Sequence, residues 1–410
     1  MSSGLFTTAL MTQDLAKKSF AGMITRLMPN GAAPLFGMTA MLQSETAYAY
    51  EHGFFTKTML LPQVTTFGSL HTAADTTLTV TSSANILPGM ILQVNNASSR
   101  ENMIVNSVLS ATQITVTRGL SIAAAIIPAS TDLYQVGNAF EEASLRPQSL
   151  IINPVRITNF TQIFRNTWAL SGTAQQTSMI AGDTNMAESR MDCAAFHAAD
   201  IEKALFFGQK SQGTRNGLPF HTMDGLINIV NTPANYPPIY AGVPNIFTAG
   251  GTTTYPQFEG FVDPMFNQTT DPKVGNKRIM FVGGTARKAL NQMARLATNS
   301  LYEISDGQTS WGLQYSTIKT SRGEFDMVEH PLLNSNASWS KMAVAVDLST
   351  FRVAYLGDRK TQNREFNSAN DVSDNGIDAV GGTLTTELTC VVKNPPANGV
   401  IYNLTAGAAG

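Results

Sequence analysis

The longest run of helically spaced apolar positions lies between residues 185 and 208. Asn185 and Glu188 have the spacing of a capping box, and Gly208 is typical of the residue that follows a helix. A helix over these residues would be a rod of about 30 Å, because each residue adds ~1.5 Å. That length suits a structural spine. The predicted apolar side of this helix consists of Met191, Ala194, Ala198, Ile201 and Leu205.

Between residues 72 and 137 the pattern changes to short runs in which apolar and polar residues alternate. Pairs such as Pro88-Gly89 and Arg118-Gly119 separate these runs and are typical of turns. Several short strands at this spacing indicate a small all-β module. Extended sequence on both sides indicates that the module is an insertion. The expected strands are residues 77–80, 90–94, 102–108, 113–118 and 132–136.

The C-terminal half predicts more strands and another helix, so the fold class is α+β. A strand at 278–282 leads into a helix that Thr285 caps and that carries apolar residues through Leu296. The apolar segment 225–230 is expected to be a short buried strand, and the Gly-rich segment 248–257 a flexible surface loop. Further strands are expected at 313–319, 324–329, 342–347, 351–356 and 382–392.

Residues 1–45 predict an arm that lies on something else, rather than an independent domain. Their amphipathic pattern, over residues 15–27, ends at Pro29-Asn30-Gly31, and the surrounding sequence is low in charge. Residues 46–67 look extended, with β-favouring side chains and a proline that is tolerated only at a sheet edge. This stretch is dense in large apolar residues, which would form an aggregation-prone patch on a monomer. They are Phe54, Phe55, Met59, Leu60 and Leu61.

Composition indicates a chain that is covered by other molecules. Charged residues make up 14% of the 410 residues, against roughly 25% in typical soluble domains. A subunit covered by its neighbours needs fewer charges, because charge is depleted at interface cores. The 27 basic and 29 acidic residues give a net charge of −2. The sequence has no basic run of the kind that a sequence-reading DNA-binding protein carries.

Cys193 and Cys390 are far apart and belong to no metal or redox motif. We expect them to be small buried side chains in a reducing cytosol. No stretch reaches the ~18 apolar residues of a membrane span, and the first residues lack the pattern of a secretory signal. These features predict a protein that is made and used in a cytoplasm, with no membrane partner.

Residues that could carry chemistry are few. The sequence contains no Walker loop, dinucleotide-binding fingerprint, nucleophile elbow or zinc-protease motif, and its five histidines lack metal-ligand spacing. We therefore expect no catalytic residue, no cofactor and no metal. His197 and Asp200 could form half of an acid–base site, but a solvated or interfacial helix pair is the stronger interpretation. The helix carboxylates are expected to form its polar face: Asp183, Glu188, Asp192, Asp200 and Glu202.

Several segments occur in the order found in one family of structural proteins. NFTQIFRNTWALSGTAQQT (159–177) resembles the strand that enters the spine helix in the SU10-like family of phage major head proteins. DIEKALFFGQKSQG (200–213) and MDGLINIV (223–230) are similar to the end of that helix and its return. Other similar segments are PGMILQV (88–94), RIMFVGGTARKALNQM (278–293), GEFDMVEHPLL (323–333), MAVAVDLSTFRVAYLGD (342–358) and GTLTTELTCVVKNPPANGVIYNL (382–404).

The resemblance implies a major capsid protein with the HK97-like fold. It implies self-assembly into hexamers and pentamers, and an icosahedral virion head that encloses packaged double-stranded DNA and is built in the bacterial host cytoplasm. Separate scaffolding, portal and decoration proteins are further partners that it allows. The expected parts are an N-terminal arm (1–45), an extended loop (46–71), an inserted β-module (72–137), the loop return and strands (138–172), a peripheral domain with the spine helix (173–224), an axial domain (225–340) and closing strands with the tail (341–410).

The resemblance gives the apolar cluster near the N-terminus a role. Phe54, Phe55, Met59, Leu60 and Leu61 become candidates for inter-subunit contact, and the alternative is an ordinary core strand of a compact domain. Two other functions stay open. A tail-tube or decoration protein would be another phage structural part, although a tube subunit is usually smaller and more uniformly β. A hydrolase would need a site that no local motif reveals.

Overall fold

The computed structural model describes residues 33–56, 63–66, 69–95, 100–150, 154–177, 185–235, 244–266, 276–296, 305–310, 313–366 and 378–408. The chain divides into two compact units. The first unit comprises Met1–Gly53, Thr158–Asn235 and Val243–Gly410, and the second comprises Phe54–Ile157 and Tyr236–Gly242.

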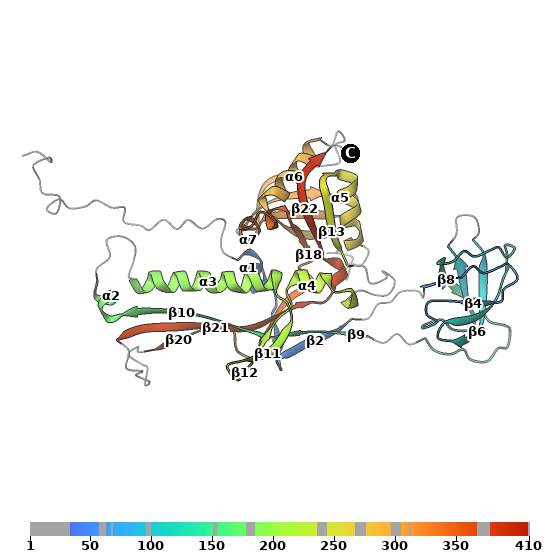
Figure 1. Cartoon of the computed structure of the whole chain (residues 1–410), viewed down its shortest axis with the longest axis horizontal. Helices are drawn as coiled ribbons and strands as arrows, with labels where there is room; N and C mark the ends of the chain where they lie inside the picture. The colour runs from blue at the N-terminus through green and yellow to red at the C-terminus, as the bar shows by residue number, and fades with distance from the viewer. Residues whose placement is uncertain are drawn as a thin grey trace, which may run out of the picture. The chain divides into compact units, whose positions relative to one another are not determined.

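A long sheet forms the base of the first unit, and helix α3 (Asn185–Phe207) lies along one of its faces (Figure 1). Phe164 and Trp168 of β10 are buried on the helix side, whereas Arg165 and Thr167 are exposed on the other side. This alternation is expected of an antiparallel strand pair, here β10 and β21, in a sheet with one covered face. The sheet order is β1 (Glu45–Ala47), β19 (Phe351–Leu356), β21 (Ala379–Val392) and β10 (Gln162–Ser171), with β20 (Gln362–Phe366) also paired to β21.

Helix α3 contacts the sheet through every fourth residue rather than through the predicted apolar side. Met191 is 48% exposed and Ala194 is exposed as well, so the prediction is wrong over the first half of the helix. The reason is that β10 and β21 provide polar partners for His197. A different set of helix positions therefore faces the sheet. The buried line consists of Cys193, His197, Ile201 and Leu205, and Cys390 is buried in β21, as predicted for both cysteines.

Helix α3 ends where two glycines meet. The backbone N–H of Gly225 donates to Gly208 O at 2.9 Å, and a Cβ on Gly208 would lie only 2.6 Å from Ala204 O and Met223 O. This close approach leads into α4 (Leu226–Asn231), a helix where the sequence predicted a strand. The strand prediction was wrong because the buried residues of this segment have helical spacing. They are Leu226, Ile229 and Val230.

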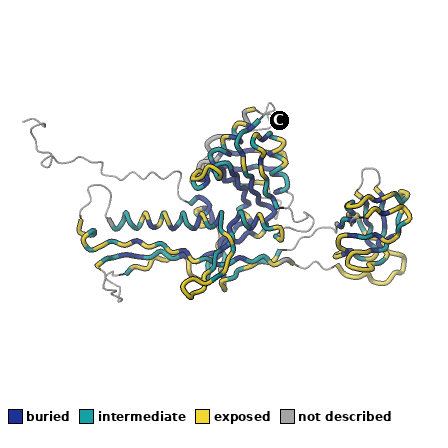
Figure 2. The backbone as a smooth tube through the Cα atoms, viewed as in Figure 1, coloured by how far each residue is buried: buried dark blue, intermediate teal, exposed yellow. Residues whose placement is uncertain are grey.

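A seven-stranded sheet forms the core of the other lobe of the first unit, and its central strands, β18, β14 and β17, are mostly buried (dark blue in Figure 2). Phe281 and Val344 belong to one buried cluster, whereas their neighbours Met280 and Ala343 belong to another. Both faces of this sheet are therefore covered, which explains its almost continuously apolar central strands. The order is β13 (Ile246–Thr254), β22 (Gly399–Ala408), β18 (Ala343–Val346), β14 (Lys277–Val282), β17 (Glu324–Glu329), β16 (Leu313–Lys319) and β15 (Ser305–Ser310).

Two local predictions in this lobe were wrong. Residues 248–257 are not a loop, because they belong to β13, which bulges at Gly251, and to α5 (Tyr255–Val262), which starts with a capping box between Thr254 and Gln257. Helix α6 (Gly284–Leu296) starts one residue before Thr285, and Asn334 Oδ1 accepts its first N–H at 2.6 Å. The strands expected at 313–319, 324–329 and 351–356 are confirmed with the same bounds, and those expected at 342–347 and 382–392 are confirmed within three residues at their ends.

Smaller elements complete the first unit. β2 (Glu51–Thr56) and β9 (Val155–Phe160) pair as a two-stranded ribbon that continues into the second unit. β11 (Ser211–Arg215) and β12 (Leu218–Thr222) form a hairpin whose turn, Asn216-Gly217, has positive φ at both residues. The remaining helices are α1 (Pro34–Met41), α2 (Gly172–Gln176), α7 (Pro331–Asn334) and the 3-10 turns η2 (Pro233–Asn235), η4 (Asp263–Phe266), η5 (Trp339–Lys341) and η6 (Pro395–Ala397). The pattern at 15–27 lies outside the described residues.

The second unit is a small barrel around an apolar core. A bridge between Thr66 and Val80 joins its two outer strands, so the sheet closes on itself. The five strands expected here are confirmed, and β3, from the preceding extended segment, pairs with β8 as the sixth. The order is β3 (Gln63–Thr65), β8 (Asp132–Asn138), β5 (Met90–Val94), β6 (Asn102–Ser110), β7 (Gln113–Thr117) and β4 (Thr77–Thr79).

An ion pair at one end of the barrel holds the segment after β7. Arg118 Nε and Nη2 donate to the two carboxylate oxygens of Glu101 at 2.9 Å and 2.6 Å. The N–H groups of Gly119 and Ala125 also donate to this carboxylate, each at 3.1 Å. Burial opposes the charge, but Arg118 and these amides hold the pKa of Glu101 below its usual value.

Candidate assembly surfaces

Aromatic rings hold the root of the β2–β9 ribbon. The His221 ring of β12 stacks on Tyr50 at a centroid distance of 4.7 Å and lies 5.5 Å from Phe160. Lys210 Nζ lies 4.4 Å from the Phe160 centroid and donates to Thr158 O at 3.0 Å and to its Oγ1 at 2.8 Å. An isolated two-stranded ribbon is only marginally stable in water. These contacts therefore stabilise the point from which the ribbon starts.

The described part of the ribbon carries two of the five predicted contact residues. Phe54 is half-buried, and Phe55 is 68% exposed. Met59, Leu60 and Leu61 lie outside the described residues. Phe55 thus presents a large apolar ring at the surface of β2, and its contact with a neighbouring subunit stays a prediction.

The return segment after the barrel, residues 141–150, is exposed throughout. Its apolar side chains include Leu145, at 92% exposed, and Leu150, at 40%. Glu141 and Glu142 lie at its start, and the N–H of Ser144 donates to Glu141 O at 3.2 Å in a tight turn. A compact monomer rarely leaves such groups in water within one segment.

The five-stranded sheet has an open face on the side away from α3. The hydroxyls of Thr167 and Thr383 lie 3.2 Å apart on this face. Arg364 pairs with Thr383 in the β20–β21 register, so its side chain lies on the same face, as does that of Arg165. The next residue, Glu365, faces the opposite way and pairs with Arg190 of α3. The open face is therefore rich in Thr and Arg.

A buried carboxylate anchors the arm to the spine helix. Glu202 of α3 accepts the backbone N–H groups of Leu35 and Phe36, at the start of α1, at 2.8 Å and 2.7 Å. It also lies 2.6 Å from Nε2 of His330, and both side chains are fully buried. The prediction that Glu202 belongs to the polar face of the helix was therefore wrong. A negative charge suits the start of α1, where backbone N–H groups lack partners.

The hydrogen bonds of His330 define its tautomer. Its Nδ1 accepts the N–H of Leu332 at 3.2 Å, which places the proton on Nε2, facing Glu202. The edges of Phe206 and Phe281 pack around the imidazole at centroid distances of 4.9 Å and 5.6 Å. The pair therefore acts as a structural connection between α3, the arm and the seven-stranded sheet, with no access for a substrate.

His197 has a structural role as well. Its Nδ1 lies 2.7 Å from Asn166 Oδ1 and its Nε2 lies 2.8 Å from Thr386 Oγ1, so it links α3 to both β10 and β21. It is 3% exposed, and burial, which Asp200 opposes, lowers its pKa. The expectation of a solvated or interfacial His197–Asp200 pair was wrong, because Asp200 bonds Asn166 and Lys203 at the surface.

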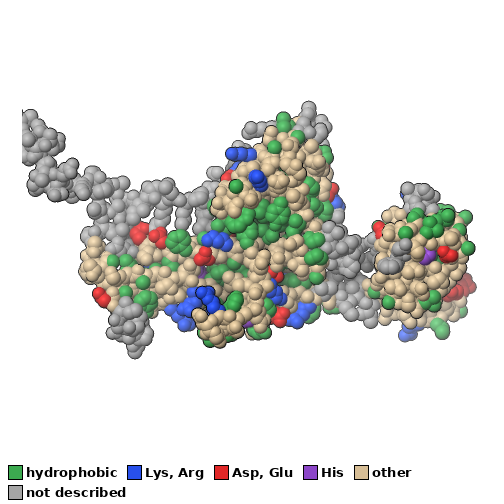
Figure 3. Space-filling view, in the orientation of Figure 1, with side chains coloured by type: hydrophobic (Ala, Val, Ile, Leu, Met, Phe, Trp, Pro, Cys, Tyr) green, Lys and Arg blue, Asp and Glu red, His purple; other side chains and the backbone are tan. Residues whose placement is uncertain are grey.

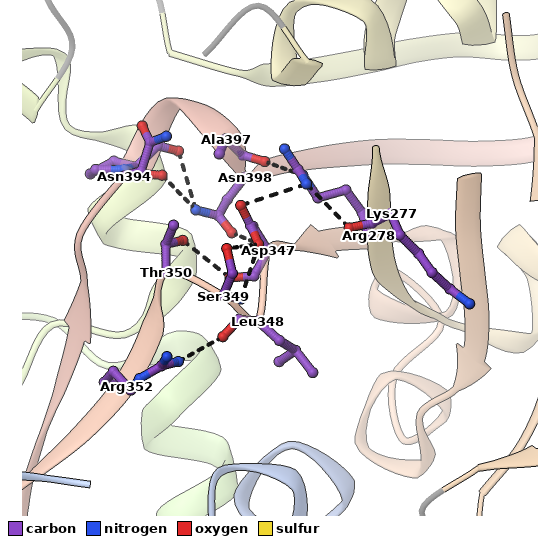
Figure 4. Close-up of polar contacts among 11 residues, drawn as sticks. Lys277, Arg278, Asp347, Leu348, Ser349, Thr350, Arg352, Asn394, Ala397 and Asn398 are labelled. Carbon is purple, nitrogen blue, oxygen red and sulfur yellow. Dashed lines mark hydrogen bonds and ion pairs between the residues drawn. The ribbon is translucent and has the colours of Figure 1, made fainter. Parts of the chain in front are cut away.

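Two turns join the sheets of the first unit (Figure 4). One turn, residues 347–350, leads from β18 to β19, and the other, residues 393–398, leads from β21 to β22. Asn398 connects them, because its Oδ1 accepts the N–H of Asp347 at 2.8 Å and its Nδ2 donates to Asn394 O at 2.9 Å. The Lys393 N–H donates to Thr350 O at 3.0 Å. The crossing is thus a hydrogen-bonded unit of its own.

Arg278 of β14 reaches this crossing from one side. Its Nε donates to Ala397 O at 3.2 Å, and its Nη1 lies 3.6 Å from Asp347 Oδ2 (Figure 4). The guanidinium is buried and lies 5.3 Å from the ring centroid of Phe266. Burial lowers the pKa of Arg278, and Asp347 opposes this change. A buried guanidinium needs such partners, since an unpaired charge in this position would be costly.

Sequence reasoning did not find these buried polar residues. Glu202 had a detectable signal, because it follows Ile201 and precedes Leu205 by three residues on a helix face predicted to be apolar. Arg278 had none, since its partners Asp347 and Ala397 lie far along the chain. Among the described residues, no three His, Cys, Asp or Glu side chains gather as metal ligands would. No described helix has the length and apolar character needed to cross a membrane.

Comparison with known proteins identifies the family. The SU10 major capsid protein family matches residues 4–405. The major capsid protein of Pseudomonas phage PaMx41 is 37% identical over 413 residues, covering 98% of this chain and 96% of that relative. The capsid structure of cyanophage P-SCSP1u matches with a TM-score of 0.50 and 7% identity over 100% of both chains.

A spine helix on a long sheet, a second mixed sheet and a β ribbon define an α+β capsid subunit of the HK97-like class, and the cyanophage capsid has the same fold. The chain belongs to the SU10 major capsid protein family, as its ordered sequence segments predicted. It is the major structural protein of a phage capsid. The tail-tube, decoration and hydrolase alternatives are not supported by this family.

Proposed function

We propose that copies of this chain associate into hexamers and pentamers, which close into an icosahedral head around packaged double-stranded DNA. Shell building is then its whole function, without catalysis. The observation that carries this proposal is the exposure of large apolar groups on the ribbon and on its return, with Phe55 at 68% and Leu145 at 92%. An obligate interface of ~2,000–5,000 Å² would bury such groups on a neighbouring copy.

The expected parts map onto the architecture in a simple way. In this proposal the five-stranded sheet with α3 is the peripheral domain, and the seven-stranded sheet is the axial domain near the symmetry axis of the ring. The β2–β9 ribbon is the extended loop, the barrel is its insertion, and α1 is the anchored end of the arm. Closed rings reuse the same patch on every subunit, so the ribbon of each copy would reach the next copy around the ring.

The test replaces Phe55 and Leu145 by Asp in the full chain. Because both side chains are exposed, the free energy of unfolding of the dissociated variant, measured by thermal unfolding, should stay within about 0.5 kcal/mol of wild type. The yield of closed particles, counted by negative-stain microscopy and sedimentation, should fall by at least about tenfold, since a charge would enter a desolvated contact.

A matched control replaces Leu109, an exposed apolar residue of the barrel (57%), by Asp. This variant should form particles at the wild-type yield. Normal particles from the Phe55/Leu145 variant would contradict the assigned contact. A wild-type chain that stays a monomer at every concentration would contradict shell building itself.

A further inference from the structure

We propose that Asn216, in the turn of the β11–β12 hairpin, is a site of spontaneous covalent modification, at which water replaces the side-chain amide with a carboxylate. The dipeptide Asn216-Gly217 supplies both reacting groups, an amide carbon and a backbone nitrogen that no neighbouring side chain shields. The same dipeptide occurs again at Asn398-Gly399, where the fold protects it. The proposal concerns a single subunit and does not depend on the proposed function.

The reaction takes place within the chain and consumes only water. The backbone nitrogen of Gly217 loses its proton to a base in solution and attacks Cγ of Asn216. The new N–Cγ bond closes a cyclic imide while the Cγ–Nδ2 bond breaks, and Nδ2 takes a proton from water and leaves as ammonia. Water then opens the imide at one of its two carbonyls, with no change of oxidation state. Opening at Cγ gives aspartate, and opening at the main-chain carbonyl gives isoaspartate, whose peptide link runs through the side chain.

The turn of the hairpin leaves room for this reaction. Arg215 pairs with Leu218 in the β11–β12 register, so Asn216 and Gly217 are the two turn residues, with φ of 52° and 74°. All residues from 214 to 220 are exposed. A Cβ built on Gly217 would meet no atom within 4 Å, and no hydrogen bond from the described residues holds the Asn216 amide. Water and base therefore reach both reacting groups.

The tip of the hairpin can also open. β11 and β12 form a two-stranded sheet, and no third described strand pairs with either. The contacts that hold the hairpin lie at its root, where His221 stacks on Tyr50 and Thr222 Oγ1 donates to Gln209 O at 2.7 Å. A two-stranded hairpin is only marginally stable, and local opening costs least where an element is exposed. Opening lets the Asn216 side chain turn toward the nitrogen of Gly217.

The surroundings of the turn are basic. Arg215 directly precedes Asn216 and is exposed. In Figure 3 Lys and Arg side chains gather along the lower border of the first unit, where Figure 1 labels β11 and β12. A nearby positive charge stabilises the anionic nitrogen that attacks, because an opposite charge favours the charged form of a group. The same positive charge favours the carboxylate that the reaction leaves.

The second dipeptide, Asn398-Gly399, shows what prevents the reaction. Asn398 is fully buried, its Oδ1 accepts the N–H of Asp347 and its Nδ2 donates to Asn394 O (Figure 4). A Cβ built on Gly399 would overlap Cε of Met265, so the backbone here has no space in which to turn. Ring closure would require the whole crossing between the two sheets to open. The two identical dipeptides therefore differ in their environment.

The two products would affect the hairpin differently. Aspartate keeps the turn, because Asp-Gly fits the same two-residue hairpin turn as Asn-Gly. Isoaspartate adds a backbone atom to a turn whose length fixes the pairing of Arg215 with Leu218. Strand pairing would then be lost from the tip. Modification would thus add a negative charge and loosen an exposed element, while the core of the first unit stays intact.

Peptide mapping of the full-length chain tests the site. Native wild-type protein is incubated in mildly alkaline heavy-oxygen water and digested in mildly acidic buffer, so that mass spectrometry counts only amides lost during the incubation. The peptide with Asn216 should take up label, as aspartate and isoaspartate, at least about tenfold faster than the peptide with Asn398, since an exposed tip opens at a far lower free energy than a buried turn. In denaturant the two peptides should react at similar rates.

Asn216→Gly is the matched control, because Gly-Gly supports the same turn and carries no amide. This variant should unfold at the wild-type temperature, take up no label in the hairpin peptide and keep the wild-type rate at Asn398. An Asn216 peptide that stays unlabelled in the native chain, while the denatured chain reacts, would overturn the proposal. Equal labelling of the two peptides in the native chain would overturn it as well, because exposure would then not select the site.

Discussion

The barrel of the second unit and the five-stranded sheet of the first unit bury their apolar surface in different ways. In the barrel every strand has a neighbour on both sides, because the Thr66–Val80 bridge closes the sheet. In the five-stranded sheet α3 covers one face, while no described residue covers the other face or pairs with the outer edge of β10. A closed sheet has no free edge to offer, whereas an open one is a template for a partner. The barrel is therefore a self-sufficient module, whereas the five-stranded sheet is a framework with surface available for a partner.

The largest expected effect comes from Arg278→Ala. This change leaves the buried Asp347 carboxylate without its cation and removes the hydrogen bond to Ala397. We expect the first unit to lose about 3–5 kcal/mol of unfolding free energy. Hydrogen exchange of dissociated subunits should show faster exchange in β14 and β18 and unchanged exchange in the barrel strand β5. Arg215→Ala, at an exposed arginine, is the control and should change neither the unfolding free energy nor the exchange rates. If Arg278→Ala also made exchange faster in β5, the two units would not unfold independently.

The reverse experiment is Arg118→Ala in the barrel. Glu101 would keep the N–H groups of Gly119 and Ala125 but would lose its ion pair. Because the two amides still solvate the carboxylate, we expect a smaller loss, about 2–3 kcal/mol, confined to the second unit. Protection of β5 and β6 should fall while that of β14 stays constant. Equal losses of protection in both units would show that the barrel is not a module that is stable independently of the first unit.

A pH dependence of stability near pH 6.5 is expected from His197 of the spine helix. Burial lowers the pKa of His197 below 6.5 in the folded chain. Below about pH 6.5 the unfolded chain therefore binds more protons, so the unfolding free energy of the first unit falls as pH drops toward the folded pKa. One proton gives a slope of at most about 1.4 kcal/mol per pH unit, and above pH ~6.5 the contribution is complete. Urea unfolding of wild type and His197→Gln over this range should show the slope only in wild type; an equal slope in both would assign it to other groups.

The sequence predicted this molecule best where burial follows a simple period. The barrel strands at 90–94 and 113–117 were found because alternation continues without interruption between clear turns. Segment 225–230 was read as a strand, although the same residues satisfy helical spacing, because a short apolar run fits both periods. The position of Glu202 beside the apolar helix positions gave a local signal of its burial, but its partners Leu35 and His330 could not be predicted, since they come from distant segments that only folding brings together.

The two candidate contact surfaces differ in the same way in how far the sequence reveals them. The apolar density at Phe54 and Phe55 is visible in one stretch of sequence, so the sequence can nominate it. The open basic face is invisible there, because Arg165 and Arg364 come from two strands that are joined only through β21. A surface made by the register of three strands requires the fold to be known.

The smallest expected effect tests the corrected face of α3. If the helical pattern of the sequence were right, Met191 would be a core residue, and Met191→Ser would cost about 2–5 kcal/mol. In the structure Met191 is 48% exposed, so we expect a change within about 0.5 kcal/mol for the dissociated subunit. Leu205→Ala, on the buried line, is the matched control and should cost the full core penalty. Equal losses for the two variants in urea unfolding would show that α3 is rotated on its sheet, and the hydrogen bonds of His197 to Asn166 and Thr386 would then have to be abandoned.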